Sequence, residues 1–427
     1  MAKDAGEYRA AMDFIMAREH FGIKLGLRNI TSFLKAAGCP HNDYPSVLIA
    51  GTNGKGSTAA AIDAVIREAG YKVGIFTSPH LVDFRERIRV NGRLISRQYI
   101  TSFIKKHRRV IEKHRITFFE VCTALAFCYF ADKKVDLAIV EVGLGGRLDA
   151  TNTLSPILSI ITDISYDHTN ILGSTIRKIA REKAGIIKAK STVLTGLLPP
   201  EARGEVTRTC RIKKAPLIQL SKKDFARNGK PFRFDYFGSA SPVKNLRFSL
   251  PGNHQIHNAA IVLQAAGILR EKGFSITRKA IRAGLKNTSW PGRFQICKRR
   301  GKPAVILDVG HNPAGVRAMV ACFRELYPGR KADLVMGFVR HKSLREIVRC
   351  LQLIARRVEI ARLQTDRSTD PAEVIACFSR GIEVNASHSL VVSARKLVRS
   401  AADDDIVIVC GSHFAVGEFL ARQHTIL

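Results

Sequence analysis

The chain has 427 residues, of which 46% are hydrophobic and 25% are charged. This is the composition of a globular protein, and the length favours two domains over a single core. The 69 lysines and arginines against 36 acidic residues give a net charge of +33, but they are spread along the chain without interleaved aromatic residues. We therefore expect no nucleic-acid binding, although the charge keeps it open as an alternative.

Membrane and redox signals in the sequence point to one compartment. No apolar run reaches the roughly 20 residues of a membrane span, and residues 1–10 contain no apolar signal core. The nine cysteines are scattered without a C-x-x-C pair. Cys122, Cys128 and Cys410 lie in apolar surroundings, which predicts buried free thiols and no zinc site. We expect a cytoplasmic protein without a membrane partner.

Apolar strand-like runs alternate with helical patterns, which predicts parallel sheets covered by helices. Two helices are predicted at Ser57–Ala69 and His257–Lys272, each followed by the glycine that is common past a helix C-terminus. The strand-like runs form two series, which lie at residues 47–50, 73–76, 137–142 and 157–162, and at residues 304–309, 334–338, 358–361 and 406–410.

Residues 199–250 interrupt this alternation, because they are polar, basic and rich in turn residues. Short alternating runs such as residues 232–237 predict a small antiparallel β section. The sequence Trp290-Pro291-Gly292-Arg293 then separates the two series of strands. We expect an α/β protein in which residues 1–290 form a mostly parallel sheet plus the β section and residues 291–427 form a Rossmann-like α/β domain.

The first strand runs into a glycine-rich turn, Gly51-Thr52-Asn53-Gly54-Lys55-Gly56-Ser57. Glycines let the backbone approach an anion, and the following helix points its free N–H groups at it. Lys55 adds a positive charge, and the hydroxyl of Ser57 or Thr58 suits a magnesium ion. The spacing departs from the common P-loop, since the first two glycines are too close and a glycine follows the lysine. A chance turn is the alternative, but the flanking strand and helix favour a P-loop ATPase domain.

Polar side chains also follow the next strands. Glu141 lies near the end of a predicted buried strand, before another glycine turn, and Asp167 and His168 follow the strand after that. Ligands bind at the C-terminal ends of parallel strands, so Glu141 is a natural magnesium ligand. For His168, a structural role and a metal or substrate role are both open.

Several motifs resemble the folylpolyglutamate synthase/dihydrofolate synthase family of the Mur ligase superfamily. They occur in the family's order over almost the whole chain, and the family's own loop has the unusual glycine spacing. The motifs are the turn at residues 51–57, Thr77-Ser78-Pro79-His80-Leu81, the stretch from Glu141 to Asn152, Arg181-Glu182-Lys183-Ala184-Gly185-Ile186, Pro291-Gly292-Arg293-Phe294, Leu307-Asp308-Val309-Gly310-His311-Asn312-Pro313 and Val409-Cys410-Gly411-Ser412.

The resemblance implies an amide-forming ligase in which ATP phosphorylates an acceptor carboxylate and the amine of L-glutamate displaces phosphate. It implies ATP and Mg²⁺ as cofactors, with a monovalent cation as a further candidate. Lys183 matches a lysine that is carbamylated in the family. The implied catalytic residues are Lys55, Lys183 and His311; the nucleotide-binding residues are Gly54, Lys55, Gly56, Ser57, Asn258, Arg293 and Asp308; the magnesium ligands are Ser57, Ser78, Glu141 and His168.

Two stretches resemble the dihydropteroate-binding residues of the bifunctional members, namely Thr117-Phe118-Phe119-Glu120 and Leu148-Asp149-Ala150. The aromatic pair would stack on a pterin ring, and a carboxylate would bind its amino-pyrimidine edge. In the alternative interpretation, Phe118 and Phe119 begin an apolar helix and only pack.

The resemblance thus implies addition of L-glutamate to dihydropteroate and to reduced folates by a monomeric enzyme. Two other enzymes remain open: a folylpolyglutamate synthase without the dihydropteroate activity, and another Mur-type amide ligase. The alternative of a different class is a P-loop nucleic-acid-binding ATPase. We expect the basic charge to attract ATP and anionic folate polyglutamates.

Overall fold

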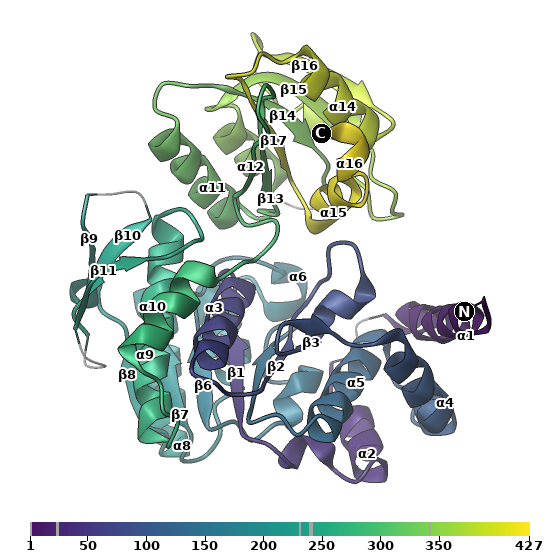
Figure 1. The fold of residues 1–427 in the computed structure, drawn as a ribbon, viewed down its shortest axis with the longest axis vertical. Helices are drawn as coiled ribbons and strands as arrows, with labels where there is room; N and C mark the ends of the chain where they lie inside the picture. The colour runs from purple at the N-terminus through teal and green to yellow at the C-terminus, as the bar shows by residue number, and fades with distance from the viewer. Residues whose placement is uncertain (1, 23–24, 230–231, 239–241, 341–342) are drawn as a thin grey trace. The chain divides into compact units, whose positions relative to one another are not determined.

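The computed structural model describes residues 2–22, 25–229, 232–238, 242–340 and 343–427. They fall into two units, coloured by residue number in Figure 1. Unit 1 contains Met1–Pro79, Arg85–Arg247 and His257–Thr288, and unit 2 contains His80–Phe84, Phe248–Ile256 and Ser289–Leu427. The chain therefore passes into unit 2 twice before the predicted division at residue 290.

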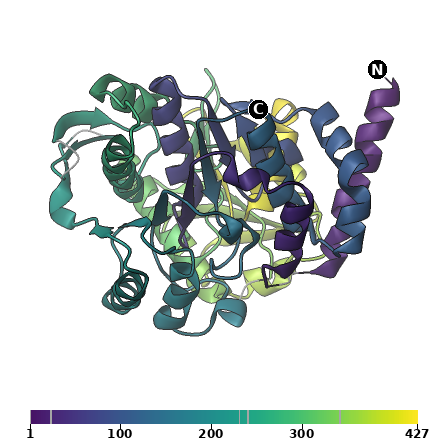
Figure 2. The same cartoon turned by 90° about the horizontal axis from the view of Figure 1, so that it is seen from below.

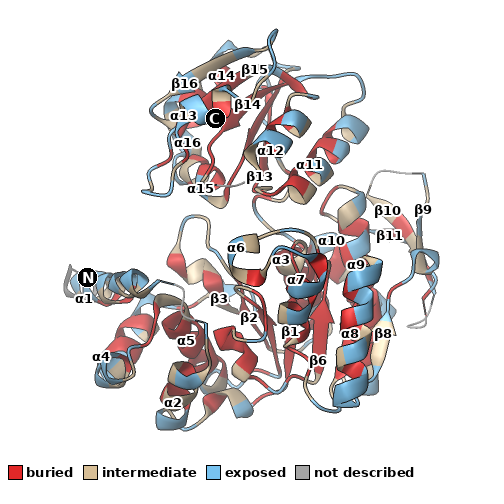
Figure 3. Cartoon of the chain, turned by 180° about the vertical axis from the view of Figure 1, so that it is seen from behind, coloured by how far each residue is buried: buried red, intermediate tan, exposed pale blue. Residues whose placement is uncertain are grey.

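An eight-stranded sheet forms the centre of the described part of unit 1, in the order β4-β3-β2-β5-β1-β6-β7-β8. Pairing is parallel from β2 to β8, and β3 and β4 add an antiparallel edge. Figure 3 shows its central strands buried. The strands are β1 (Ser46–Ala50), β2 (Val73–Phe76), β3 (Ile88–Val90), β4 (Arg93–Leu94), β5 (Leu137–Glu141), β6 (Leu158–Ile161), β7 (Thr192–Thr195) and β8 (Leu217–Gln219).

Helices connect these strands. Four of them begin at a serine or threonine whose side chain accepts a backbone N–H, which satisfies a donor that the first turn leaves unpaired. Figure 2 shows α1 and α4 side by side, joined by an ion pair of Lys105 with Glu7 at 2.8 Å. The helices are α1 (Ala2–Met16), α2 (Arg28–Ala36), α3 (Lys55–Glu68), α4 (Arg97–Lys113), α5 (Phe118–Asp132), α6 (Thr169–Leu172), α7 (Ile176–Ala184), α8 (Pro200–Lys213), α9 (Asn253–Glu271) and α10 (Arg278–Asn287), with short 3₁₀ turns η1 (Ala17–Phe21), η2 (Pro40–Asn42), η3 (Phe84–Arg87), η4 (Ala150–Thr153) and η5 (Lys222–Asp224).

The predicted β section between residues 199 and 250 is only partly correct. Its second half forms an antiparallel sheet of β9 (Phe225–Arg227), β10 (Arg233–Tyr236) and β11 (Val243–Arg247). The first part instead forms the helix α8, which starts at Pro200, and β8, which pairs parallel with β7 in the large sheet. The buried residues Ala202, Val206 and Cys210 recur every four positions on α8, a helical period that the many basic residues obscure in the sequence.

Unit 2 contains a six-stranded sheet in the order β12-β13-β17-β14-β15-β16, parallel except for β12. One buried cluster lies beneath α11 and α12, and a second lies beneath α14 and α15, so helices cover both faces. The elements are β12 (Gln295–Cys297), β13 (Ala304–Asp308), β14 (Ala332–Met336), β15 (Ala355–Ala361), β16 (Glu383–Ser387), β17 (Ile406–Cys410), α11 (Pro313–Leu326), α12 (Leu344–Leu351), α13 (Pro371–Ile375), α14 (Leu390–Ser400), α15 (His413–Ala421) and α16 (Gln423–Ile426).

The strands of both predicted series occur, with ends that differ by up to three residues. Cys122, Cys128 and Cys410 are buried free thiols, as predicted. Within the described residues, no helix is long and apolar enough to cross a membrane.

Candidate active site

The glycine-rich turn joins β1 to α3, and Gly54 is the residue before the first turn of the helix. Its φ of 82° lies in the left-handed region, which favours glycine. A Cβ at Gly54 would also lie 2.5 Å from Asn258 Oδ1. Gly54 therefore lets α9 approach the turn closely, and this brings the predicted nucleotide-binding residue Asn258 beside the predicted phosphate cradle.

A second loop holds the turn in place. The backbone N–H groups of Thr52 and Asn53 donate to Asp163 Oδ1 at 3.1 and 2.5 Å. Thr162 Oγ1 donates to the carbonyl of Asn53 at 2.6 Å. Sequence reasoning missed Asp163, although it lies two residues after β6 and β6 pairs with β1. Asp163 is thus a positioning residue, since it ties the turn to the neighbouring strand.

Two lysines converge on the carbonyl of Gly51. Lys55 Nζ donates to the carbonyls of Gly51 and Thr52 at 3.1 Å each, and Lys183 Nζ on α7 donates to Gly51 at 2.7 Å. Burial and then the nearby charge of Lys55 lower the pKa of Lys183 to about 7, against the attraction of acidic groups led by Asp163. A substantial fraction of Lys183 is therefore a neutral amine at neutral pH.

Two of the predicted magnesium ligands lie together at the C-terminal ends of the central strands. Glu141 ends β5 beside Ile49 of β1, and its Oε2 accepts the backbone N–H of Ser78 at 3.1 Å. Ser57 is buried in the first turn of α3. Glu141 and the two hydroxyls are hard oxygen donors, which fit Mg²⁺ bound together with substrate phosphates.

His168, the fourth predicted magnesium ligand, is exposed and lies next to Asp167. It precedes α6 in a left-handed conformation, and its side chain is 49% exposed, with Nε2 3.9 Å from Asp167 Oδ1. Among the described residues, no three histidine, cysteine or acidic side chains gather into a metal cluster. A magnesium ion here would need ligands from substrate and water, which is the usual mode for Mg²⁺ at phosphates.

Glu120 has a clear structural role. Thr117 and Glu120 form a capping box at the start of α5, in which Glu120 Oε2 accepts from Thr117 N and Thr117 Oγ1 at 2.8 Å each. The Phe119 ring lies over Gly143, where a Cβ would collide with it, and the Phe118 ring lies 5.2 Å from the guanidinium of Arg87. Both phenylalanines are half-buried.

Asp149 is likewise engaged by its own loop. Its carboxylate accepts from Leu144 N at 2.8 Å and from Thr151 N at 3.0 Å, and burial raises its pKa. The carbonyl of Leu148 accepts from Gly26 N at 3.3 Å. The segment before α2 therefore borders the predicted acceptor stretch 148–150, a contact that no sequence signal indicated.

In unit 2, Asp308 ends β13. Its oxygens accept from Phe294 N at 2.9 Å and Gly310 N at 2.7 Å, and burial raises its pKa against the nearby charge of Arg293. His311 Nδ1 lies 3.1 Å from the carbonyl of Val309, and its ring lies 5.3 Å from that of His413. Within unit 2, the structure therefore brings Arg293 close to Asp308, with His311 three residues beyond.

Two family models match the chain. Residues 49–266 match the Mur ligase middle domain, and residues 292–413 match the glutamate ligase domain of Mur ligases. A dihydrofolate synthase/folylpolyglutamate synthase of Bacillus subtilis is 36% identical over 374 residues, which cover 85% of this chain and 86% of that protein. The chain belongs to the dihydrofolate synthase/folylpolyglutamate synthase family of Mur ligases. The resemblance of the motifs is thereby confirmed.

Solved structures of this family share the fold. Escherichia coli FolC in complex with DHPP and ADP has a TM-score of 0.87 and 29% identity, covering 97% of this chain and 98% of that one. A bifunctional folylpolyglutamate synthase/dihydrofolate synthase with Mn, AMPPNP and L-glutamate bound has a TM-score of 0.85, the same identity and the same coverage. The predicted α/β fold class is confirmed.

Substitution of Glu120 should measure its structural role as part of the capping box. Glu120→Ala removes the capping box and should lower the free energy of unfolding by about 1–2 kcal/mol. Glu120→Gln keeps an acceptor oxygen at that position and should cost less than about 1 kcal/mol. Chemical denaturation of both variants measures this. Equal losses of stability in both variants would show that the contribution of Glu120 to stability does not come from the capping box.

Proposed function

We propose that the chain is an ATP-dependent ligase that adds L-glutamate to dihydropteroate and, in further rounds, to reduced folates. The observation that carries the proposal is the convergence of Lys55 and Lys183 on the Gly51 carbonyl, at a glycine turn that leads into a helix N-terminus. The ligands named for the related structures, ADP, AMPPNP and L-glutamate, support the same chemistry. We further propose that the enzyme is a monomer that does not use nucleic acid.

In this proposal the turn binds the phosphates of ATP. The N–H groups of Gly56 and Ser57 and the Lys55 ammonium neutralise the charge of the transferred phosphoryl group, so the acceptor carboxylate attacks it and ADP leaves. The amine of L-glutamate then attacks the acyl phosphate, loses a proton and expels phosphate. Ser57, Ser78, Glu141 and His168 would hold Mg²⁺, which would supply charge neutralisation.

Lys183 fits the proposed carbamate. Carbamylation forms a bond between a neutral amine and the carbon of CO₂ with loss of a proton, and the lowered pKa of Lys183 provides that amine. The product is an anion beside Lys55, and it would attract the Lys55 ammonium. Carbamate oxygens would also suit Mg²⁺ or a monovalent cation.

For the acceptor, we propose that Phe118 and Phe119 stack on the pteridine ring, since both residues are only half-buried. Because Glu120 and Asp149 are held by Thr117 and by the 144–151 loop, their contribution is to fix these stretches. Arg293, Asp308 and His311 are proposed nucleotide-binding and catalytic residues of the glutamate ligase domain, residues 291–427.

A coupled assay of ADP release tests the proposal. It would supply L-glutamate with dihydropteroate, dihydrofolate or tetrahydrofolate, and product mass would be measured by mass spectrometry. We expect acceptor-dependent ADP release and addition of one glutamate residue to dihydropteroate. Turnover with folates only would identify a folylpolyglutamate synthase, and turnover stimulated by DNA or RNA without an acceptor would contradict a ligase.

A further inference from the structure

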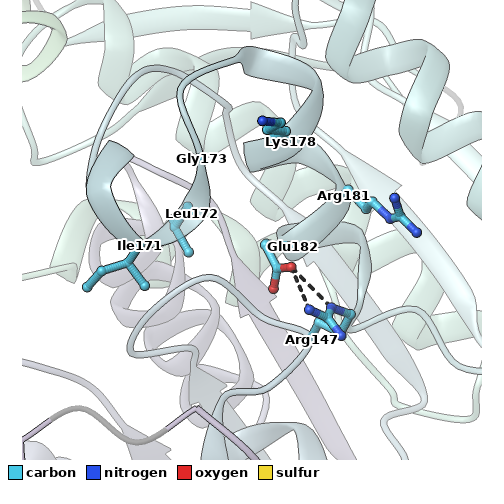
Figure 4. Close-up of a pocket in the computed structure, with 7 residues that line it drawn as sticks. All are labelled: Arg147, Ile171, Leu172, Gly173, Lys178, Arg181 and Glu182. Atoms are coloured by element: carbon cyan, nitrogen blue, oxygen red, sulfur yellow. Dashed lines mark hydrogen bonds and ion pairs between the residues drawn. The ribbon is translucent and has the colours of Figure 1, made fainter.

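A cavity of about 380 Å³ opens in unit 1 between α6, α7 and the loop after β5 (Figure 4). Its charged lining consists of Arg147, Lys178, Arg181 and Glu182. Arg147 and Glu182 face each other, with Nε and Nη2 of Arg147 at 3.1 and 2.9 Å from Glu182 Oε1. Lys178 and Arg181 are exposed and form no salt bridge among the described residues, although the charge of Arg181 also acts on Glu205 of α8, so the cationic groups of the lining outnumber its one carboxylate.

The opposite wall of the cavity is apolar. Leu172 is buried and Ile171 half-buried, and both belong to α6. Gly173 lets the chain approach α7, because a Cβ there would lie 2.8 Å from Lys178 Cβ. A ligand that fits this lining carries carboxylates on one side and methylene groups on the other. A γ-linked glutamate chain has this chemistry, with one α-carboxylate and two side-chain methylenes in every residue.

The cavity borders the loop that leads into the proposed acceptor stretch. Lys178 precedes Lys183 by five residues on α7, which places it about 7.5 Å along the helix axis and about 140° around it, so the cavity lies on another face of this helix than the Lys183 contact with Gly51. Arg147 immediately precedes the proposed acceptor stretch 148–150, and its backbone N–H donates to the Glu182 carbonyl at 2.8 Å. The glutamate residues of a folate tail follow its pteridine, so a tail that leaves the acceptor stretch beside Arg147 would reach the cavity.

We propose that the cavity binds α-carboxylates of the γ-linked glutamate tail of the acceptor, through Lys178 and Arg181. This assignment rests on the proposed function and concerns only acceptors that already carry glutamate. Dihydropteroate has no glutamate and should not use the cavity. The site would therefore distinguish acceptors by tail length.

The test compares two double variants with the same change of charge. Lys178→Gln/Arg181→Gln alters the cavity, whereas Arg177→Gln/Arg203→Gln alters exposed residues of α7 and α8 that do not line it. We would measure KM and kcat with dihydropteroate, with tetrahydrofolate, and with tetrahydropteroyl tri-γ-glutamate. For the cavity variant we expect the KM of the triglutamate acceptor to rise about three- to tenfold, with dihydropteroate unchanged. Isothermal titration with the triglutamate should show the same loss of affinity.

The control variant should leave all three acceptors unchanged. An equal rise of KM in both double variants would show a general effect of charge and overturn the proposal. An unchanged KM for the triglutamate in the cavity variant would overturn it as well. Both outcomes would leave the ligase function standing. Failure of the unmodified enzyme to use any pteridine acceptor would instead contradict the proposed function.

Discussion

Replacement of Lys55 by alanine should reduce acceptor-dependent ADP release at least about a hundred- to thousandfold. The variant loses the positive charge at the phosphate cradle and also the hydrogen bonds of Nζ to the Gly51 and Thr52 carbonyls. The backbone of the turn is held independently by Asp163, so its shape should persist. Lys55 is only half-buried and alanine favours helix, so the free energy of unfolding should change by less than about 1 kcal/mol.

Lys55→Arg is the matched control for charge. Arginine keeps the positive charge but presents a planar fork instead of a compact ammonium, so we expect partial activity. Steady-state kinetics and thermal denaturation of wild type and both variants make the comparison. Undiminished turnover in the folded alanine variant would contradict the proposed role of Lys55 in binding phosphate.

Lys183→Met should also abolish turnover, and it should change how stability depends on pH. The pKa of Lys183 is about 7 in the folded protein and near 10.4 in an unfolded chain. Between these values the unfolded chain binds more protons, so the free energy of unfolding of the wild type rises with pH by up to about 1.4 kcal/mol per unit. Methionine does not titrate. The free energy of unfolding of the wild type should therefore rise relative to that of the variant between pH 7 and 10. Well below pH 7 the difference between the two free energies should not depend on pH.

Urea denaturation of both proteins at pH 6, 7, 8 and 9, in buffers free of CO₂, measures this difference. The absence of CO₂ keeps Lys183 as the amine and separates its titration from carbamylation. A difference in stability that stays constant from pH 7 to 9 would contradict the lowered pKa. Mass spectrometry after addition of bicarbonate would then report the carbamate directly.

The sequence predicted well those features that depend on residues near each other in the chain. Apolar runs such as Ile406–Cys410 are strands with the predicted ends, and the turn before α3 has the expected context. The capping box shows the limit of this reasoning. Thr117 and Glu120 match a T-x-x-E cap as well as a ligand-binding motif, and only the structure shows the carboxylate bound to Thr117.

Contacts between distant parts of the chain were not predictable from local patterns. Asp163 and Asn53 are 110 residues apart, and Lys183 and Gly51 are 132 apart. Each contact depends on the strand order that places β6 next to β1. The sequence marked Lys183 through its family motif, but the convergence of Lys183 and Lys55 on one carbonyl appears only in the fold.

The path of the chain between the two units limits which fragments of the protein can fold on their own. A fragment that starts at Ser289 would lack residues 80–84 and 248–256, which belong to the same unit. Leu81 in the first of these segments packs against the second core of unit 2 and lies beside Gly292 and Gly417. A C-terminal fragment would therefore expose apolar surface that the intact chain covers. Failure of such a fragment to stay in solution would reflect this missing segment, and adding the 80–84 peptide in trans or by fusion is the natural remedy.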